Sequence, residues 1–249
     1  LFQIYRQSEN SRIITNAHAV NSGRMPDIRP VQKTQICDFY WIDQDDPERA
    51  LPIISEMFVE RIPKRFKLTP AKDIQVITPM NKGSCGTISL NKILQDKINP
   101  ASGNKPQFHY GETVFRSGDK VMQTVNNYEK CVFNGDLGRI IHINSSESKF
   151  KVAFDHADVE YEFCDANQIS LAYAITVHKS QGCEFPAVII PFMTQHFLML
   201  QRNLLYTAMT RARKLLVIIG SRKALSMAVR NYKLEPRFSL LIERIKMLC

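Results

Sequence analysis

The sequence predicts an α/β protein in which a small antiparallel β-barrel is inserted into a parallel-sheet domain. Strand-like apolar segments alternate with segments of helical periodicity up to residue 110, and the alternation resumes after residue 166. This order of elements builds a parallel sheet with helices packed on it. Between the two stretches, in residues 111–166, short strand-like segments follow one another around turn signals, which is typical of a small barrel of roughly 50 residues.

The first α/β stretch begins with an expected short strand at residues 1–5. Ser8 or Ser11 is expected to cap the helix that follows, because a serine hydroxyl accepts hydrogen bonds from the free N–H groups of a first helical turn. Gly23 is expected to end that helix. Its apolar positions fall on one side at helical spacing: Ile13, Ile14, Ala17 and Val20.

Two more pairs of strand and helix follow. Aromatic and β-branched residues predict a strand at residues 37–42, and Asp46 followed by Pro47 predicts a helix start, since proline fits the first helical position. Residues 74–78 are expected to form the next strand and residues 87–98 the next helix. The apolar positions of this helix also recur at helical period: Ile88, Leu90, Ile93, Leu94 and Ile98.

The inserted stretch contains one strong turn signal, because Asn134-Gly135 between apolar segments is the strongest local cue for a β-hairpin. The strands expected around it are residues 119–125, 137–143, 150–154 and 159–163. The elements expected after the barrel are a helix at 171–179, a strand at 187–192, a helix at 201–213, a strand at 215–219 and two closing helices.

Composition favours a folded protein that works with a polyanion. The 249 residues are 44% hydrophobic and 23% charged, enough to bury one large core or two smaller ones, and the formal net charge is +9. The six cysteines contain no C-x-x-C pair, so we expect the reduced thiols of a cytoplasmic protein rather than a metal site. No apolar run approaches the ~20 residues of a membrane-spanning helix. The start lacks an initiator Met and a signal region, so we expect a soluble fragment of a longer polypeptide.

Donor side chains gather next to a glycine in the second α/β stretch. His178, Lys179 and Gln181 precede Gly182, where a ligand can approach the backbone closely, and donors without carboxylates suit phosphate oxygens or sugar hydroxyls. Glu184 is a lone acceptor placed as a partner for a ribose hydroxyl. Taken singly, each residue is more often a structural histidine or a surface charge. Together they predict a site that faces a phosphate.

Arg211 and Arg213 lie on the helix expected at residues 201–213, about 200° apart around its axis. They therefore cannot point at the same group. We expect one of them to reach a nucleotide while the other makes a local salt bridge. Two solvated arginines on a helix are the simpler interpretation of this segment taken alone.

The sequence lacks the residues that would let this chain hydrolyse a nucleotide by itself. No G-x-x-x-x-G-K-[ST] phosphate loop occurs, and Lys-Gly-Ser-Cys-Gly-Thr at residues 82–87 lacks the Gly-Lys-Ser/Thr ending that places a lysine on the β and γ phosphates. No apolar strand ends in a paired acidic motif for magnesium. Ser180 lacks the glycine-flanked elbow of a hydrolase.

The most distinctive segments are LFQIYRQ at 1–7, ITNAH at 14–18, NSGRMP at 21–26, ITPMNKG at 77–83, GDKVMQT at 118–124, NNY at 126–128, FNGD at 133–136, YAITVHKSQGCE at 173–184 and YTAMTRAR at 206–213. In their order and spacing they resemble the C-terminal half of a RecD-like DNA helicase of superfamily 1B, the exodeoxyribonuclease V alpha chain family. The resemblance covers essentially the whole chain. The segments at 173–184 and 206–213 are similar to the family's motifs V and VI.

The resemblance implies a RecA-like parallel-sheet domain, with the fold of P-loop NTPases, formed by residues 1–110 and 167–249 as a second motor domain. It implies an SH3-like barrel at residues 111–166. It also implies an ATP-dependent helicase that moves 5′ to 3′ on single-stranded DNA in recombination and repair. ATP and Mg²⁺ would be bound mainly by an upstream RecA-like domain of the same polypeptide, and RecB-like and RecC-like subunits are further implied partners.

Carried over position by position, the resemblance assigns roles to single residues. Arg6 and Arg211 become the catalytic arginines that meet a γ-phosphate held by the partner domain, since guanidinium groups stabilise charge on a transferring phosphoryl group. Gln181, Gly182 and Glu184 become the nucleotide-facing residues. The implied contacts with DNA are Pro79, Asn91, Thr176, His178 and Lys179.

Several functions remain compatible with these residues. A stand-alone RecD-like enzyme and the α chain of an exonuclease complex fit the same motifs. A non-catalytic nucleic-acid-binding module, which acts through its basic surface and its barrel, is an alternative of a different class. A related superfamily 1B RNA helicase domain is the third possibility.

Overall fold

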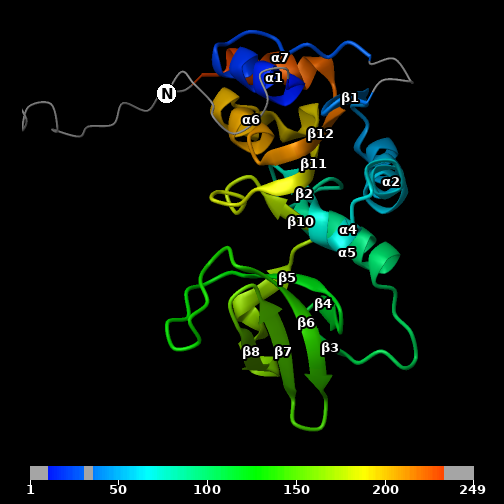
Figure 1. Cartoon of the computed structure of the whole chain (residues 1–249), viewed down its shortest axis with the longest axis vertical. Coiled ribbons are helices and arrows are strands. Elements are labelled where there is room, and N and C mark those ends of the chain that lie inside the picture. Colours follow the sequence, from blue (N-terminus) through cyan, green and yellow to red (C-terminus); the bar gives the residue numbers. More distant parts are fainter. Residues whose placement is uncertain (1–10, 31–35, 233–249) are drawn as a thin grey trace, which may run out of the picture.

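The computed structural model describes residues 11–30 and 36–232, which form an α/β domain and an adjacent β-barrel (Figure 1). The α/β domain contains a five-stranded sheet in the order β1-β12-β11-β2-β10, and every neighbouring pair in it is parallel. Its strands are β1 (Phe39–Asp43), β2 (Ile74–Thr78), β10 (Ala174–Thr176), β11 (Phe185–Phe192) and β12 (Ala212–Gly220). The predicted parallel sheet is confirmed, and the strand expected at residues 1–5 lies outside the described residues.

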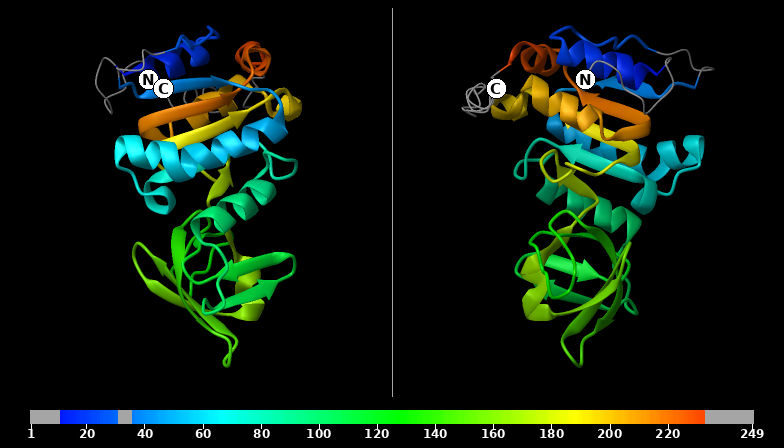
Figure 2. Two further views of the ribbon diagram at one scale, coloured as in Figure 1. Left: turned by 90° about the vertical axis from the view of Figure 1, so that its right-hand side faces the viewer. Right: turned by 60° about the vertical axis from the view of Figure 1, so that its left-hand side comes forward.

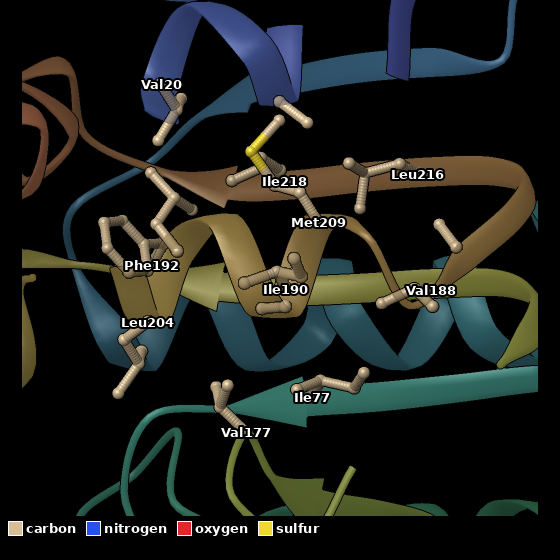
Figure 3. Close-up of a cluster of buried hydrophobic side chains, with 14 of the residues drawn as sticks. Val20, Ile77, Val177, Val188, Ile190, Phe192, Leu204, Met209, Leu216 and Ile218 are labelled. Atoms are coloured by element: carbon tan, nitrogen blue, oxygen red, sulfur yellow. The ribbon is translucent and has the colours of Figure 1, made fainter. Parts of the chain in front are cut away.

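Helices cover both faces of the sheet and enclose two hydrophobic cores (Figure 2). The helices of the first face are α1 (Arg12–Asn21), α6 (Arg202–Met209) and α7 (Arg222–Arg230). The helices of the second face are α2 (Pro47–Glu56), the π-helical η1 (Met57–Arg61), α3 (Ile62–Phe66) and α5 (Thr87–Ile98). Figure 3 shows Val20 of α1, Met209 of α6 and Ile218 of β12 in the core on the first face of the sheet. Because both faces are covered, the central strands are apolar along most of their length.

Both helix starts predicted within the described residues of the N-terminal part are confirmed. Ser11 caps α1, since its Oγ accepts a hydrogen bond from the backbone N–H of Ile14 at 3.3 Å. Asp46 caps α2 by accepting from the backbone N–H of Glu48 at 3.0 Å, with Pro47 as the first helical residue. Two short elements complete the domain: α4 (Pro70–Asp73) and η3 (Thr194–Met199). Within the described residues, no helix is long and apolar enough to cross a membrane.

The barrel consists of antiparallel strands, as predicted. Its main sheet has the order β8-β7-β6-β5-β9, and β3 and β4 form a separate hairpin. The elements are β3 (Gln107–Tyr110), β4 (Thr113–Arg116), β5 (Lys120–Gln123), β6 (Leu137–Asn144), β7 (Lys149–Phe154), β8 (Asp158–Glu162), η2 (Phe163–Gln168) and β9 (Ile169–Leu171). Stacked rings fill its interior, where the Phe108 ring centroid lies 4.2 Å from that of Phe163 and 4.9 Å from that of Phe150. The Asn134-Gly135 pair lies near the end of the connection between β5 and β6, and Gly135 has a φ of 105°.

The helix predicted at residues 171–179 is wrong. Residues 174–176 instead form β10, which pairs in parallel with β2 at the edge of the sheet. Residues 172–177 are buried without interruption, whereas an amphipathic helix would leave one side exposed. Pairing with β2 and burial on both faces therefore override the helical spacing of the apolar residues.

The helix predicted at residues 201–213 is too long. It ends at Met209, because Ala212 already pairs with Phe185 as the first residue of β12. The two arginines that were expected on one helix are consequently separated: Arg211 lies in the turn after α6, and Arg213 lies in β12. The helix expected at residues 87–98 is present as α5, and its buried side is formed by residues such as Leu90. Ile88 lies about 200° away from Leu90 around the helix and is exposed.

A buried carboxylate joins the barrel to α5. The oxygens of Asp119 accept hydrogen bonds from the side chains of Gln95, Asn99 and Tyr173 and from the backbone N–H of Arg116, at distances between 2.6 and 3.0 Å. Burial raises the pKa of Asp119, and these hydrogen bonds oppose that effect because they stabilise the charged form. Since the loss of a partner would leave a buried polar group unsatisfied, the cluster determines how the barrel meets α5.

Lys120, the next residue, joins the barrel to the parallel sheet. Its buried ammonium donates to Gln75 Oε1 at 2.8 Å and lies 5.6 Å from the ring centroid of Phe185. The amide Nε2 of Gln75 donates in turn to the carbonyl oxygens of Ala172 and Tyr173, both at 3.0 Å. Burial lowers the pKa of Lys120 to about 8, because surroundings of low polarity disfavour the ammonium form.

The low pKa of Lys120 predicts a pH-dependent stability. Between a folded-state pKa of about 8 and the ordinary value of 10.5, the unfolded chain binds more protons at this site than the folded chain. The free energy of unfolding therefore gains a contribution as pH rises through this window, up to about 3 kcal/mol. The Lys120→Met variant lacks the titrating group. The free energy of unfolding of the wild type should therefore increase relative to that of the variant as pH rises. Urea unfolding on both sides of the window measures this difference.

Lys97→Met is the matched control, because Lys97 is an exposed lysine on α5. Its stability should follow the wild-type pH profile. Tyrosines and cysteines that titrate in the same range contribute to all three proteins and so largely cancel in the comparison. Parallel profiles for wild type and Lys120→Met would show that the ammonium is not buried as described.

Candidate nucleotide and nucleic-acid interface

A groove of about 370 Å³ lies where α5 and β10 meet the barrel. Its polar side chains are amides, hydroxyls and one ammonium, and no carboxylate of the described residues lines it. These side chains include Asn81, Thr87, Asn91, Tyr110, Thr176 and Lys179. Such a lining suits a phosphodiester backbone, whose oxygens accept hydrogen bonds and carry negative charge.

Thr176 and Lys179 enter the groove from one tight turn. Thr176 is the last residue of β10, and its Oγ1 accepts from the backbone N–H of Lys179 at 3.3 Å. The carbonyl oxygen of Thr176 accepts from the backbone N–H of Ser180 at 3.0 Å. Partial burial lowers the pKa of Lys179. The donors that were predicted at a helix end therefore lie in a turn after a strand, and the turn holds them in place.

Asn91 is bound to the backbone on the other wall of the groove. Its Nδ2 donates to the carbonyl oxygens of Leu171 and Ala174 at 3.1 and 2.9 Å, and its Oδ1 accepts from the backbone N–H of Ala174 at 2.9 Å. The amide is buried and engaged at both ends. It therefore holds β10 against α5 and so shapes the groove.

Two of the five residues predicted to contact DNA lie outside the groove lining. Pro79 directly follows β2 and is buried, while His178 is exposed in the turn after β10. The groove thus brings together Asn91, Thr176 and Lys179 from two segments of the chain.

Arg211 lies in the turn between α6 and β12, whereas Arg213 lies in β12. Its Nε donates to the carbonyl oxygen of Thr207 at 3.1 Å, and its Nη1 donates to the carbonyl oxygen of Cys183 at 3.0 Å. These bonds hold the guanidinium plane beside residues 181–184. A guanidinium carries five N–H donors, so other donors of the same fork can meet an anion.

The loop beside Arg211 presents an open backbone. Gly182 has a φ of 83°, and no heavy atom of the described residues, apart from its chain neighbours, lies within 4 Å of the place a Cβ would take. Gln181 is exposed next to it. The Oε2 of Glu184 lies 3.7 Å from Nε of Arg213. The local salt bridge that the sequence predicts for one of two arginines is therefore made by Arg213.

One segment joins the groove to this loop. Thr176 is paired with Thr78 at the end of β2, whereas Ala187 is paired with Ile74 at its start. Residues 177–184 therefore run back along the length of β2, a distance of about 13 Å for the four residue steps from Thr78 to Ile74. The turn of Lys179 and the loop held by Arg211 are consequently the two ends of one short connection.

Sequence reasoning missed several residues of the groove. Thr87 ends the segment that had been considered only as a phosphate-loop imitation, and its position after a predicted strand was the available signal. Asn81 belongs to the segment at residues 77–83 that carried the family resemblance, but it was not singled out as a DNA contact. Tyr110 and Thr113 belong to the barrel side and gave no signal in the sequence, because only the fold brings them to β10. Arg6 lies outside the described residues.

The residues around Gly182 fit one side of a nucleotide. An open backbone, the carboxylate of Glu184 and the guanidinium of Arg211 supply an approach surface, an acceptor and a fork of donors. Nowhere in residues 11–30 and 36–232 do three His, Cys, Asp or Glu side chains gather as metal ligands.

Two family models match the chain. Residues 90–154 match the ATP-dependent RecD-like DNA helicase SH3 domain, and residues 171–219 match the UvrD-like helicase C-terminal domain. The first range covers most of the barrel strands. The second begins at Leu171, contains the turn of Lys179 and Arg211, and ends at Ile219 in β12.

Curated relatives match along most of the chain. It is 34% identical over 246 residues to the ATP-dependent RecD2 DNA helicase of Deinococcus radiodurans, a match that covers 99% of this chain and 32% of that protein. It is 28% identical over 234 residues to the RecBCD enzyme subunit RecD of Buchnera aphidicola, with 88% and 38% covered. The chain thus spans about a third of the length of these relatives.

Solved structures of Pif1 helicases share the fold. Bacteroides Pif1 bound to single-stranded DNA matches with a TM-score of 0.53 and 19% identity, over 99% of this chain and 56% of that chain. A structure of two Pif1 helicases at forked double-stranded DNA matches with the same score and identity, over 99% and 54%. The α/β domain therefore has the RecA-like helicase fold, and the barrel is the SH3-like domain. By these matches the chain belongs to the RecD-like family of superfamily 1B helicases and carries the helicase C-terminal domain of that family.

Proposed function

We propose that this chain is the C-terminal motor domain of an ATP-dependent DNA helicase that moves 5′ to 3′ along single-stranded DNA in recombination and repair. The observation that carries the proposal is the connection at residues 177–184. It leaves the groove at the turn of Lys179 and reaches the loop whose carbonyl group binds Arg211. A displacement of the loop beside Arg211, where the nucleotide binds, is thereby transmitted through a single short stretch of chain to the turn of Lys179, where the DNA strand binds.

In this function Arg6 and Arg211 meet the γ-phosphate of a nucleotide held by a second RecA-like domain, upstream in the same polypeptide. ATP with Mg²⁺, bound mainly by that domain, supplies the phosphoryl group whose charge the arginines stabilise. Arg211 suits this role because backbone carbonyl groups orient its guanidinium before any ligand arrives. Gln181 and Gly182 approach the nucleotide through the side-chain amide and the open backbone, and Glu184 accepts from a ribose hydroxyl.

The groove holds the phosphate backbone of single-stranded DNA. Thr176 and Lys179 donate to phosphate oxygens, and Asn91 holds β10 in the position that this requires. His178 extends the contact from the exposed side of the turn, and Pro79 stiffens the neighbouring loop after β2. Because the contacts are to phosphates, binding should depend on salt and hardly on sequence.

The proposed division of the chain follows the sequence prediction, with a RecA-like domain at residues 1–110 and 167–249 and the barrel inserted at residues 111–166. The strands β3 and β9 extend the barrel beyond these bounds, to residues 107–171. The protein acts in the cytoplasm. It works either as a stand-alone enzyme or together with RecB-like and RecC-like subunits, a setting supported by relatives named as RecBCD subunit RecD. The same surfaces serve both settings, because the nucleotide and strand contacts lie within the chain.

The arginine assignment predicts a specific loss of turnover. With the chain joined to its upstream RecA-like domain, Arg211→Ala should lower the kcat of DNA-stimulated ATP hydrolysis about 10³-fold or more, the range measured for arginines that complete a phosphoryl-transfer site. Arg211→Lys should restore little of this loss, because an ammonium lacks the planar fork. Steady-state ATPase assays with and without single-stranded DNA measure both variants.

Arg222→Ala is the matched control. Arg222 is an exposed arginine at the start of α7, and its Nε lies 3.7 Å from Asp43. Its kcat should stay within about two-fold of wild type, as expected for the loss of an exposed ion pair. If Arg211→Ala kept a kcat within a few-fold of wild type, the nucleotide assignment would be wrong.

The groove assignment predicts a change in salt dependence. Lys179→Ala should weaken the binding of single-stranded DNA and reduce the slope of log K against log salt by about 0.7, the value for one phosphate contact on a single strand. Fluorescence anisotropy titrations at several salt concentrations measure the slope. Lys151→Ala, in which a lysine of β7 paired with Asp158 is removed, should leave the slope unchanged. Equal slopes for wild type and Lys179→Ala would rule out the phosphate contact.

A further inference from the structure

We infer that Tyr110, on the barrel side of the groove, is a stacking platform for a base of the bound single strand, with Ile88 as the apolar surface contributed by α5. The inference rests on the proposed function, since it adds a base contact to the same groove. It assigns the barrel a direct part in binding the strand.

Tyr110 is presented by a rigid element. It is the last residue of β3 and is paired with Thr113 across a two-residue turn that begins at Gly111, whose φ is 56°. Side chains two residues apart lie on the same face of a strand, so Tyr110 shares its face with Phe108. Phe108 is buried and stacked on Phe163 in the barrel core. The barrel therefore anchors the strand from which Tyr110 reaches the groove.

Two apolar surfaces of the groove are exposed. Tyr110 is 38% exposed and Ile88 is 66% exposed, and both line the groove that also contains Lys179. Ile88 lies in the first turn of α5, on the side away from the core, so the hydrophobic core does not account for its position. The groove thus combines apolar surfaces with donors for phosphate, and it carries no carboxylate among the described residues.

This combination fits a nucleotide unit of a single strand. Every base has an apolar π-face, and single-strand binding proteins stack such faces on aromatic side chains while cations bind the backbone. Tyrosine loses little conformational entropy on binding, because its side chain has only two rotatable angles.

The test compares two fluorescein-labelled strands: a short oligodeoxythymidine and a strand of equal length in which abasic sites replace the thymidines. Tyr110→Ala should weaken binding of the thymidine strand about 5- to 30-fold, within the range for loss of one stacking residue. It should leave binding of the abasic strand and the salt slope of the thymidine strand unchanged, because stacking releases no counterions. Tyr110→Trp should retain or improve binding, and Ile88→Ala should show a smaller loss of the same pattern.

Tyr128→Ala is the matched control, because Tyr128 is a more exposed tyrosine on the connection between β5 and β6 and does not line the groove. It should bind both strands as wild type does. Three outcomes overturn the platform: unchanged binding in Tyr110→Ala, an equal loss on both strands, or no rescue by Tyr110→Trp. A wild-type chain without salt-dependent binding would contradict the proposed function and the platform together. If the wild-type chain binds in a salt-dependent manner and Tyr110→Ala binds the thymidine strand equally well, only the platform is contradicted.

Discussion

Two adjacent buried charges, Asp119 and Lys120, hold the barrel on the parallel sheet. A carboxylate or an ammonium can be buried only where protein groups replace the water that it loses. Asp119 accepts from Gln95 of α5, from Asn99 directly after α5 and from the Tyr173 hydroxyl. Lys120 donates to Gln75 in β2. Because these partners belong to the α/β domain, the barrel can satisfy both charges only in one orientation. The groove between the two bodies depends on that orientation.

The same network reaches the residues that form the candidate site. Gln75 binds the backbone of residues 172 and 173, Asn91 binds the backbone of residue 174, and β10 then delivers Thr176 and Lys179 to the groove. On the far side, the ring of Phe185 lies near the Lys120 ammonium and directly follows the loop at residues 181–184. One buried polar network thus positions both the groove with Thr176 and Lys179 and the loop at residues 181–184.

Predictions from the sequence were correct where local effects, such as the capping of a helix, decide the structure. Ser11 and Asp46 cap the helices for which they were assigned, and residues 74–78 and 87–98 form the expected strand and helix. The errors arose where tertiary pairing decides. Residues 171–179 have apolar spacing compatible with a helix, but β2 offers an unpaired edge that turns residues 174–176 into a strand. Likewise, Arg213 was predicted in a helix but lies in β12, because this segment pairs with β11.

The sequence by itself determined the class of fold, the order of its elements and the identity of the chemically distinctive residues. These features depend on the alternation of apolar segments, on turn residues and on motif spacing, all of which are local properties of the chain. Only the tertiary structure decided which of these residues meet. Asn91 holds β10 against α5 by hydrogen bonds, and Tyr110 of the barrel lines the same groove as Thr176 and Lys179. The reason is physical: a groove between two bodies depends on how buried charges at their junction are satisfied, and those partners, such as Gln75 and Lys120, lie 45 residues apart in sequence.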